Sequence, residues 1–96
     1  MVSDPKFAIV PGDRVVSTDL GEGVALLDLR TNVYFSLDEV GAVIWSALQE
    51  PHSKTELIDE ILSIYEVDPE QCATDVELLL NELWNAQLIE SRPEAS

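Results

Sequence analysis

The first half of the chain alternates short apolar runs with turn residues, which is the pattern of a small β-sheet. Three such runs are present, at Arg14 to Leu20, Val24 to Leu29 and Val33 to Leu37. A Gly-Glu-Gly turn separates the first two runs, and Asn32, which tolerates a left-handed backbone, precedes the third. We predict an antiparallel meander of three strands. Its last strand has one neighbour by sequence order, which leaves a free edge if no other segment covers it.

The second half carries the helical period of roughly 3.6 residues in three segments. These segments run from about Asp38 to Glu50, Ser53 to Tyr65 and Asp68 to Asn85. Ser36 with Glu39 and Ser53 with Glu56 have the spacing of capping boxes, while Asp68 followed by Pro69 is typical of a helix start. Gly41 is a poor helix former, so it indicates close packing of the first helix against the sheet.

The predicted order is therefore β-β-β-α-α-α, an α+β fold that resembles a winged helix-turn-helix with its three-stranded antiparallel sheet ahead of the helices. We expect the folded domain to span residues 14–90. Residues 1–13 are expected to form a flexible N-terminal arm, in which the run from Phe7 to Val10 can cap the core, and residues 91–96 a polar tail.

Composition changes this picture mainly through charge. Five Lys and Arg residues stand against nineteen Asp and Glu residues, which gives a formal net charge of −14 in a chain of 96 residues. Such a chain repels nucleic acid and anionic lipid surfaces and attracts cationic peptides or a basic protein. A charged-then-apolar leader and an apolar run of about 20 residues are both missing from the sequence, so we expect a cytoplasmic protein without a membrane contact.

Residues that carry enzyme chemistry are few. His52, the single histidine, lies between Pro51 and Ser53 in an expected turn, where an exposed structural role is favoured over a general base. Cys72 is the single cysteine and falls on the apolar stripe of the third helix, which favours a buried structural thiol and excludes an internal disulfide. Adjacent acids such as Asp59 and Glu60 diverge by about 100° on a helix. We predict no catalytic residue, no metal site and no cofactor.

Three binding functions compete at this point. The winged-helix topology favours a DNA-binding regulator, yet residues 55–91 hold no Lys or Arg and ten Asp and Glu residues, so the helix that would read DNA is acidic. An acidic adaptor or antitoxin-like subunit that binds a folded basic protein is a second alternative. A third possibility is capture of an extended peptide on the free edge of the last strand.

The run from Tyr34 to Trp45, YFSLDEVGAVIW, resembles the Y-x-L-N-x-x-G-x-x-I-W signature of the PqqD-like family. Asp75-Val76 and the segment from Leu83 to Ile89 are similar to the D-V…L…A-x-L-I ending of that family, so the resemblance covers about Val15 to Ile89. Asp38 stands where Asn is usual and Asn32 where Gly is frequent. Neither difference affects the expected peptide groove.

The resemblance implies a non-catalytic recognition element for ribosomally synthesised, modified peptides. Such a protein would bind a precursor's leader segment as an added strand between the third strand and the third helix. It would then present the precursor to a maturation enzyme, which we expect to be the leader peptidase of lasso-peptide biosynthesis. The chain has the length expected of a free-standing member, either a monomer or a homodimer that competes with the peptide.

Eight residues form the peptide-binding site that the resemblance implies. They are Val33, Tyr34, Phe35, Asp75, Val76, Leu79, Leu80 and Leu83. Strand alternation separates Tyr34 from its two neighbours, and Leu79 and Leu80 lie about 100° apart on a helix, so one of those leucines is expected to be the more exposed. The sequence does not decide which members are core. Trp45 and Trp84 are likewise either core residues or part of the surface where the peptidase docks.

Overall fold

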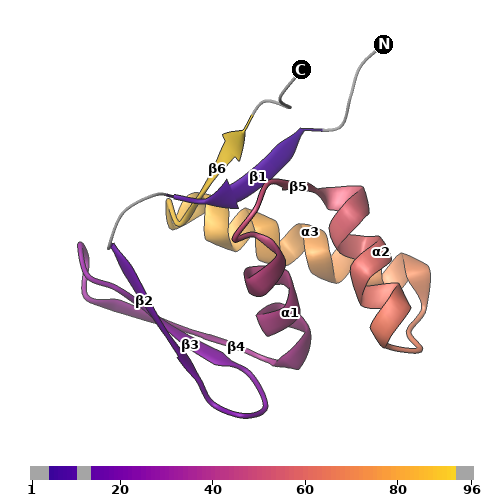
Figure 1. The fold of residues 1–96 in the computed structure, drawn as a ribbon, viewed down its shortest axis with the longest axis horizontal. Coiled ribbons are helices and arrows are strands. Elements are labelled where there is room, and N and C mark those ends of the chain that lie inside the picture. Colours follow the sequence, from indigo (N-terminus) through magenta and orange to yellow (C-terminus); the bar gives the residue numbers. More distant parts are fainter. Residues whose placement is uncertain (1–4, 11–13, 93–96) are drawn as a thin grey trace.

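The computed structural model of the chain describes residues 5–10 and 14–92, with side chains as far as residue 91. Strands β2 (Val15–Asp19), β3 (Val24–Asp28) and β4 (Val33–Leu37) form an antiparallel sheet in that order (Figure 1). Asn32 is left-handed with φ of 59°, and its N–H donates to the Asp28 carbonyl at 2.7 Å. The predicted meander and its second turn are therefore confirmed.

The structure contains a second sheet that the sequence did not predict. Strands β5 (His52–Ser53), β1 (Lys6–Ile9) and β6 (Ile89–Arg92) form it in the order β5-β1-β6, with antiparallel pairs throughout. The α+β class is confirmed, but the element order is β1-β2-β3-β4-α1-β5-α2-α3-β6 rather than β-β-β-α-α-α.

The expected flexible arm needs correction for residues 6–9. Ala8 is 4% exposed and packs inside the molecule, and the Ile9 N–H donates to the Leu48 carbonyl at 2.9 Å. These contacts and the pairing with β6 hold the segment as a strand. The expected tail is likewise a strand at Ser91 and Arg92, and His52 is half-buried in β5 rather than exposed in a turn. Residues 1–4, 11–13 and 93–96 of the expected arm and tail lie outside the described residues.

The helices follow the predicted segments closely. They are α1 (Glu39–Ala47), α2 (Lys54–Ile64) and α3 (Pro69–Asn85). The Ser53–Glu56 capping box and the Asp68 cap with Pro69 at the start of α3 are present as predicted. The capping box of Ser36 with Glu39 is wrong: Ser36 pairs with Ala25 inside the sheet, so it cannot cap a helix. Asp38 caps α1 instead and accepts a hydrogen bond from the Gly41 N–H at 2.8 Å.

The core lies where the inner face of the β2–β3–β4 sheet meets the three helices. Leu26, Ile44, Leu57 and Leu83 are among its nearly inaccessible side chains. Cys72 is 4% exposed in this core, as predicted. Burial, and secondarily the Asp75 carboxylate, raises the pKa of its thiol, so Cys72 is a poor nucleophile.

A polar cluster ties the sheet to the end of α3. Asp28, 1% exposed, accepts a hydrogen bond from the Arg30 N–H at 2.9 Å, and Arg14 Nε lies 3.7 Å from the same carboxylate oxygen. The two guanidinium groups then donate to Gln87, Arg14 to its carbonyl at 2.6 Å and Arg30 to its side-chain oxygen at 2.8 Å. Since Gln87 lies two residues after the end of α3, this cluster fixes the position of the sheet relative to that helix.

This cluster makes stability depend on pH in a defined direction. Burial raises the pKa of Asp28, but the Arg30 N–H and the charges of Arg14 and Arg30 outweigh burial and leave it below its ordinary value. The carboxylate therefore stabilises the fold above about pH 4, and this contribution is lost as the pH falls through the lowered pKa. Denaturant unfolding of wild type and Asp28→Asn should show a stability difference at pH 7 that narrows below pH 4. A difference that grows towards low pH would contradict this role.

Candidate functional site

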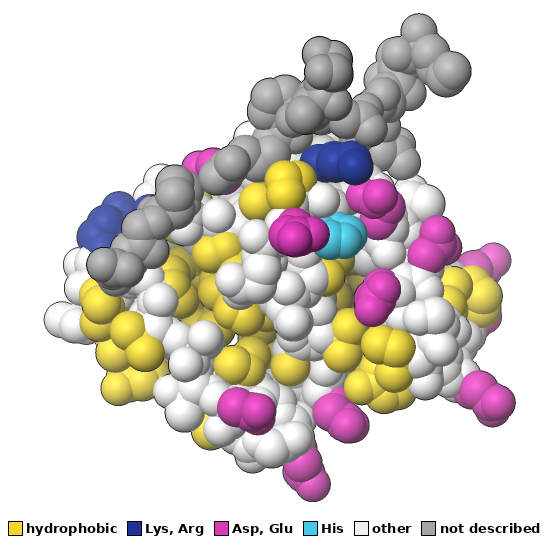
Figure 2. Space-filling model, viewed as in Figure 1, with side chains coloured by type: hydrophobic (Ala, Val, Ile, Leu, Met, Phe, Trp, Pro, Cys, Tyr) yellow, Lys and Arg dark blue, Asp and Glu magenta, His cyan; other side chains and the backbone are white. Residues whose placement is uncertain are grey.

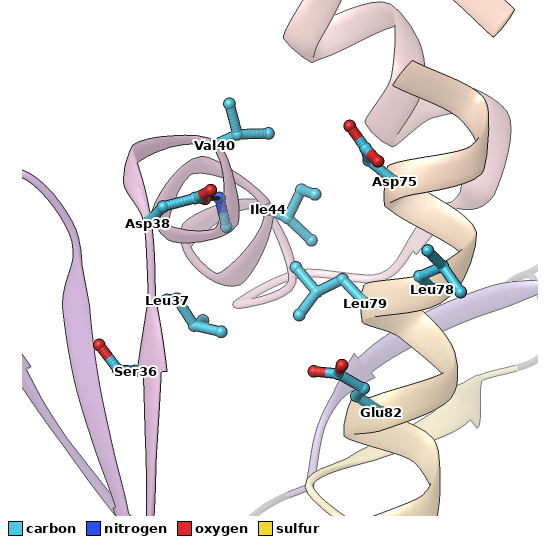
Figure 3. Close-up of a pocket in the computed structure, with 10 residues that line it drawn as sticks. Ser36, Leu37, Asp38, Val40, Ile44, Asp75, Leu78, Leu79 and Glu82 are labelled. Atoms are coloured by element: carbon cyan, nitrogen blue, oxygen red, sulfur yellow. Dashed lines mark hydrogen bonds between the residues drawn. The ribbon is translucent and has the colours of Figure 1, made fainter. Parts of the chain in front are cut away.

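Strand β4 has one unpaired edge within the part of the chain that the structure describes. Its residues pair with β3 from Val33 opposite Asp28 to Leu37 opposite Val24, and no described strand pairs with the other side. Figure 3 shows this side of β4 and the helix α3 on opposite sides of a pocket, with α1 behind it. The N–H and C=O groups of a free edge are available to an added extended chain.

The pocket between them has a volume of about 360 Å³, and we call it the β4–α3 groove. Strand β4 and helix α1 contribute one wall and the floor, and α3 contributes the other wall. Its lining residues are Ser36, Leu37, Asp38, Val40, Gly41, Ile44, Asp75, Leu78, Leu79 and Glu82. The floor is thus largely apolar, and carboxylates border it.

One face of α3 supplies four of these residues. Asp75, Leu78, Leu79 and Glu82 stand at i, i+3, i+4 and i+7, the spacing that brings side chains onto one face of a helix. Figure 3 shows Leu79 and Glu82 pointing from α3 towards β4, on which Leu37 points back. Gln71 donates a hydrogen bond to Asp75 Oδ1 at 3.0 Å and so orients that carboxylate.

Gly41 allows α1 to close one end of the groove. A Cβ atom at this position would lie 2.9 Å from the Cβ of Leu37, closer than side chains normally approach. The absence of a side chain therefore permits the first turn of α1 to lie against the end of β4, as the sequence predicted. This contact brings the Asp38 cap and Val40 to the groove.

The predicted strand residues divide between the two faces of the sheet. Phe35 is half-buried and packs against the core opposite Leu26, whereas Tyr34 is 72% exposed on the outer face. Val33 is 45% exposed at the start of the strand. The structure thus assigns the faces that the sequence left open. All three residues lie on the strand with the free edge, where the backbone N–H and C=O groups of alternate residues face the open side.

The predicted helix residues divide in the same way. Asp75 and Leu79 line the groove, but Val76, Leu80 and Leu83 are 0%, 7% and 1% exposed in the core. The structure places these three in the core and not in the groove lining, because the stripe they share with Cys72 faces the other helices and the sheet. Leu79 is thus the more exposed member of the Leu79–Leu80 pair.

Sequence reasoning missed most of the groove lining. The additional residues are Ser36, Leu37, Asp38, Val40, Gly41, Ile44, Leu78 and Glu82. One signal was available in the sequence: Leu78 and Glu82 share a helical face with the candidate Asp75. The residues of β4 and α1 carried no such signal, because their proximity to α3 depends on the tertiary packing.

The two tryptophans have different roles. Trp45 is 5% exposed and belongs to the core. Trp84 is 48% exposed and contacts Phe7 of β1 edge to face, with ring centroids 5.9 Å apart. An apolar surface at the second sheet therefore remains accessible at Trp84, outside the β4–α3 groove.

The described part of the chain offers little for other chemistry. Within residues 5–10 and 14–92, no three His, Cys, Asp or Glu side chains gather in a way that could hold a metal ion. The His52 ring lies 3.0 Å from the Glu50 carbonyl and outside the groove. Among the described helices, none has the length and apolarity needed to cross a bilayer.

Comparisons with known proteins agree with this geometry. The family model described as coenzyme PQQ synthesis protein D (PqqD) matches residues 23–89. The solved structure "TbiB1 in Complex with the TbiA(beta) Leader Peptide" is 38% identical, covers 91% of this chain and 99% of its own, and has a TM-score of 0.74. A second, "Lasso peptide synthetase B1 complexed with the leader peptide", is 25% identical, covers 88% and 96%, and has a TM-score of 0.72.

A search of curated protein sequences found no match. The family match extends from the residue before β3 to the first residue of β6 and includes every residue that lines the groove. The resemblance noted from the sequence is confirmed on this basis, and the chain belongs to the PqqD family.

Proposed function

We propose that this protein binds the leader segment of a ribosomally synthesised precursor peptide in the β4–α3 groove. The leader would add to the free edge of β4 as a further strand and place alternate side chains against Leu37, Ile44 and Leu79. The observation that carries the proposal is this open edge beside an apolar groove, in a chain 38% identical to a protein solved with a leader peptide. Main-chain hydrogen bonds would give affinity, and the groove would select side chains.

The same proposal includes no catalytic step by this chain. The protein would present the bound precursor to a separate maturation enzyme, and the lasso synthetase B1 neighbour favours the leader peptidase of a lasso pathway. A peptide held along β4 would project from the groove at both ends. Such a peptide can therefore remain accessible to an enzyme beyond the recognised segment.

DNA binding receives less support. A winged helix-turn-helix would place α3 in the major groove, but α3 exposes Glu70, Asp75, Glu77 and Glu82, which repel phosphates. Figure 2 shows magenta acidic side chains spread across the right and lower parts of one face, with dark-blue Lys and Arg side chains at its upper and left margins. The acidic surface fits a peptide partner better than a duplex.

The proposal is tested by titrating the ¹⁵N-labelled protein with the synthetic leader of a precursor encoded beside it. We expect the largest amide shifts along Val33–Leu37 and on the groove face of α3, because these backbone groups would change hydrogen-bonding partners or environment. Shifts confined to the β5-β1-β6 sheet or to α2 would contradict the assignment. Binding through buried side chains should also survive high salt, whereas docking of a folded basic protein on the acidic surface should not.

A further inference from the structure

Two carboxylates border the apolar part of the groove wall on α3. Asp75 lies one turn before the Leu78–Leu79 pair and Glu82 lies one turn after it. Figure 3 shows Asp75 near the level of α1 and Glu82 further along α3, with Leu79 between them. The wall thus presents the order acid, apolar, acid along its length.

These two charges have no cation beside them in the part of the chain that the structure describes. Ion pairs there join Lys6 to Glu56, Arg14 to Asp28 and Lys54 to Glu77, and no Lys or Arg is among the residues that line the groove. The third groove acid, Asp38, is engaged as the cap of α1. A cationic ligand group would therefore meet Asp75 and Glu82 without displacing a cation of the described chain, and the one hydrogen bond that Gln71 donates to Asp75 Oδ1 comes from a neutral amide.

The spacing of the two acids suits an extended peptide. Seven residues of α-helix advance by about 10 Å, so the Leu78–Leu79 pair lies about 5 Å from each acid along the axis. On a strand, residues two positions apart lie on one face and are separated by about 7 Å. The strand spacing of about 7 Å exceeds the distance of about 5 Å along the helix axis by about 2 Å, which a flexible Lys or Arg side chain can span.

We propose that the groove recognises a leader segment in which Lys or Arg stands two residues before and two residues after an apolar residue. The apolar side chain would contact Leu37 and Leu79, one cation would meet Asp75 and the other Glu82. This inference rests on the proposed function and specifies its ligand. The order acid, apolar, acid reads the same in both directions, so the pattern holds for a parallel or an antiparallel added strand.

The test begins with a displayed library of random short peptides, selected on the intact protein and counter-selected on the Leu79→Asp variant to keep peptides that depend on the groove. We expect these peptides to share an apolar residue flanked at both second positions by Lys or Arg. Groove-dependent peptides without this enrichment would overturn the inference and leave the proposed function standing. Failure to select any groove-dependent peptide would overturn the proposed function and this inference with it.

Two double variants then separate local from overall charge. Asp75→Asn with Glu82→Gln removes both groove acids, while Asp59→Asn with Glu66→Gln removes two exposed acids that lie outside the groove. Both raise the net charge by two. We expect the groove variant to bind the selected peptides about 10-fold more weakly than wild type in low salt, because each of the two lost exposed ion pairs contributes about 3-fold. The control variant should bind within about 2-fold of wild type. Equal losses in the two variants would overturn the inference.

Discussion

Replacement of Leu79 by aspartate is expected to abolish leader binding in a domain that stays folded, whereas the same change at Leu80 should unfold the domain. Leu79 is half-buried and lines the groove, so a carboxylate there places an uncompensated charge against the apolar part of the peptide. Leu80 is 7% exposed in the core. Burying a carboxylate in place of a core leucine costs about 4 kcal/mol or more, a large fraction of the stability of a small domain.

Chemical denaturation and leader titration separate the two effects. We expect Leu79→Asp to lose about 1–2 kcal/mol of stability and at least about 100-fold in affinity, the second figure corresponding to about 2.7 kcal/mol of lost contacts. Ile64→Asp is the matched control, because Ile64 is a 52% exposed helical residue outside the groove. It should bind the leader nearly as well as wild type. Unfolding of Leu79→Asp, or a folded Leu80→Asp that no longer binds, would reverse the assignment of these two leucines.

The elements predictable from the sequence are those whose causes are local. The bounds of β4, the left-handed Asn32 and the caps at Ser53 and Asp68 depend on neighbours within about four residues, and the structure has all of them. The error at Ser36 has the same origin. Its spacing to Glu39 fits a capping box, but pairing with Ala25 extends the strand to Leu37 and moves the cap to Asp38.

The second sheet was not predictable because its stability comes from distant partners. Ala8 lies opposite Glu90, and Phe7 lies opposite both Ser91 and His52, so each strand is short and pairs only with segments far along the chain. In the sequence alone, no neighbouring strand is joined to the run from Lys6 to Ile9 by a short turn, so this run resembles a flexible chain end. Only the packing of the helices brings the first and last described strands together.

The site was predictable in outline but not residue by residue. The free edge of β4 and its helical neighbour follow from element order and family resemblance, and Asp75 and Leu79 do line the groove. The choice between Leu79 and Leu80 could not be made, because both fit an apolar stripe and the direction of the core depends on where α1 and α2 lie. For the same reason, no sequence pattern identified Ile44 or Val40 as groove residues.

Gly23→Ala is expected to distort the end of β4 and so to weaken both the fold and the groove. Gly23 precedes β3, and a Cβ atom at this position would overlap the carbonyl oxygen of Leu37, a backbone atom that cannot rotate away. Leu37 must then move, although it pairs with Val24 and lines the groove. We expect a stability loss of about 2–3 kcal/mol, typical of forced overpacking, together with weaker leader binding.

Gly21→Ala provides the control within the same turn. Gly21 has φ of 88° with open space around it, so alanine there meets backbone strain of about 1 kcal/mol but no steric overlap. Gly23→Ala should therefore be less stable than Gly21→Ala in thermal and chemical unfolding. Only Gly23→Ala should alter leader affinity, since a Cβ atom at Gly23 meets the groove residues Leu37 and Asp38 whereas one at Gly21 meets open space. If both variants lose the same stability and bind the leader as wild type does, β4 keeps its position despite the added methyl group. The close approach of Gly23 to Leu37 would then have no part in forming the site.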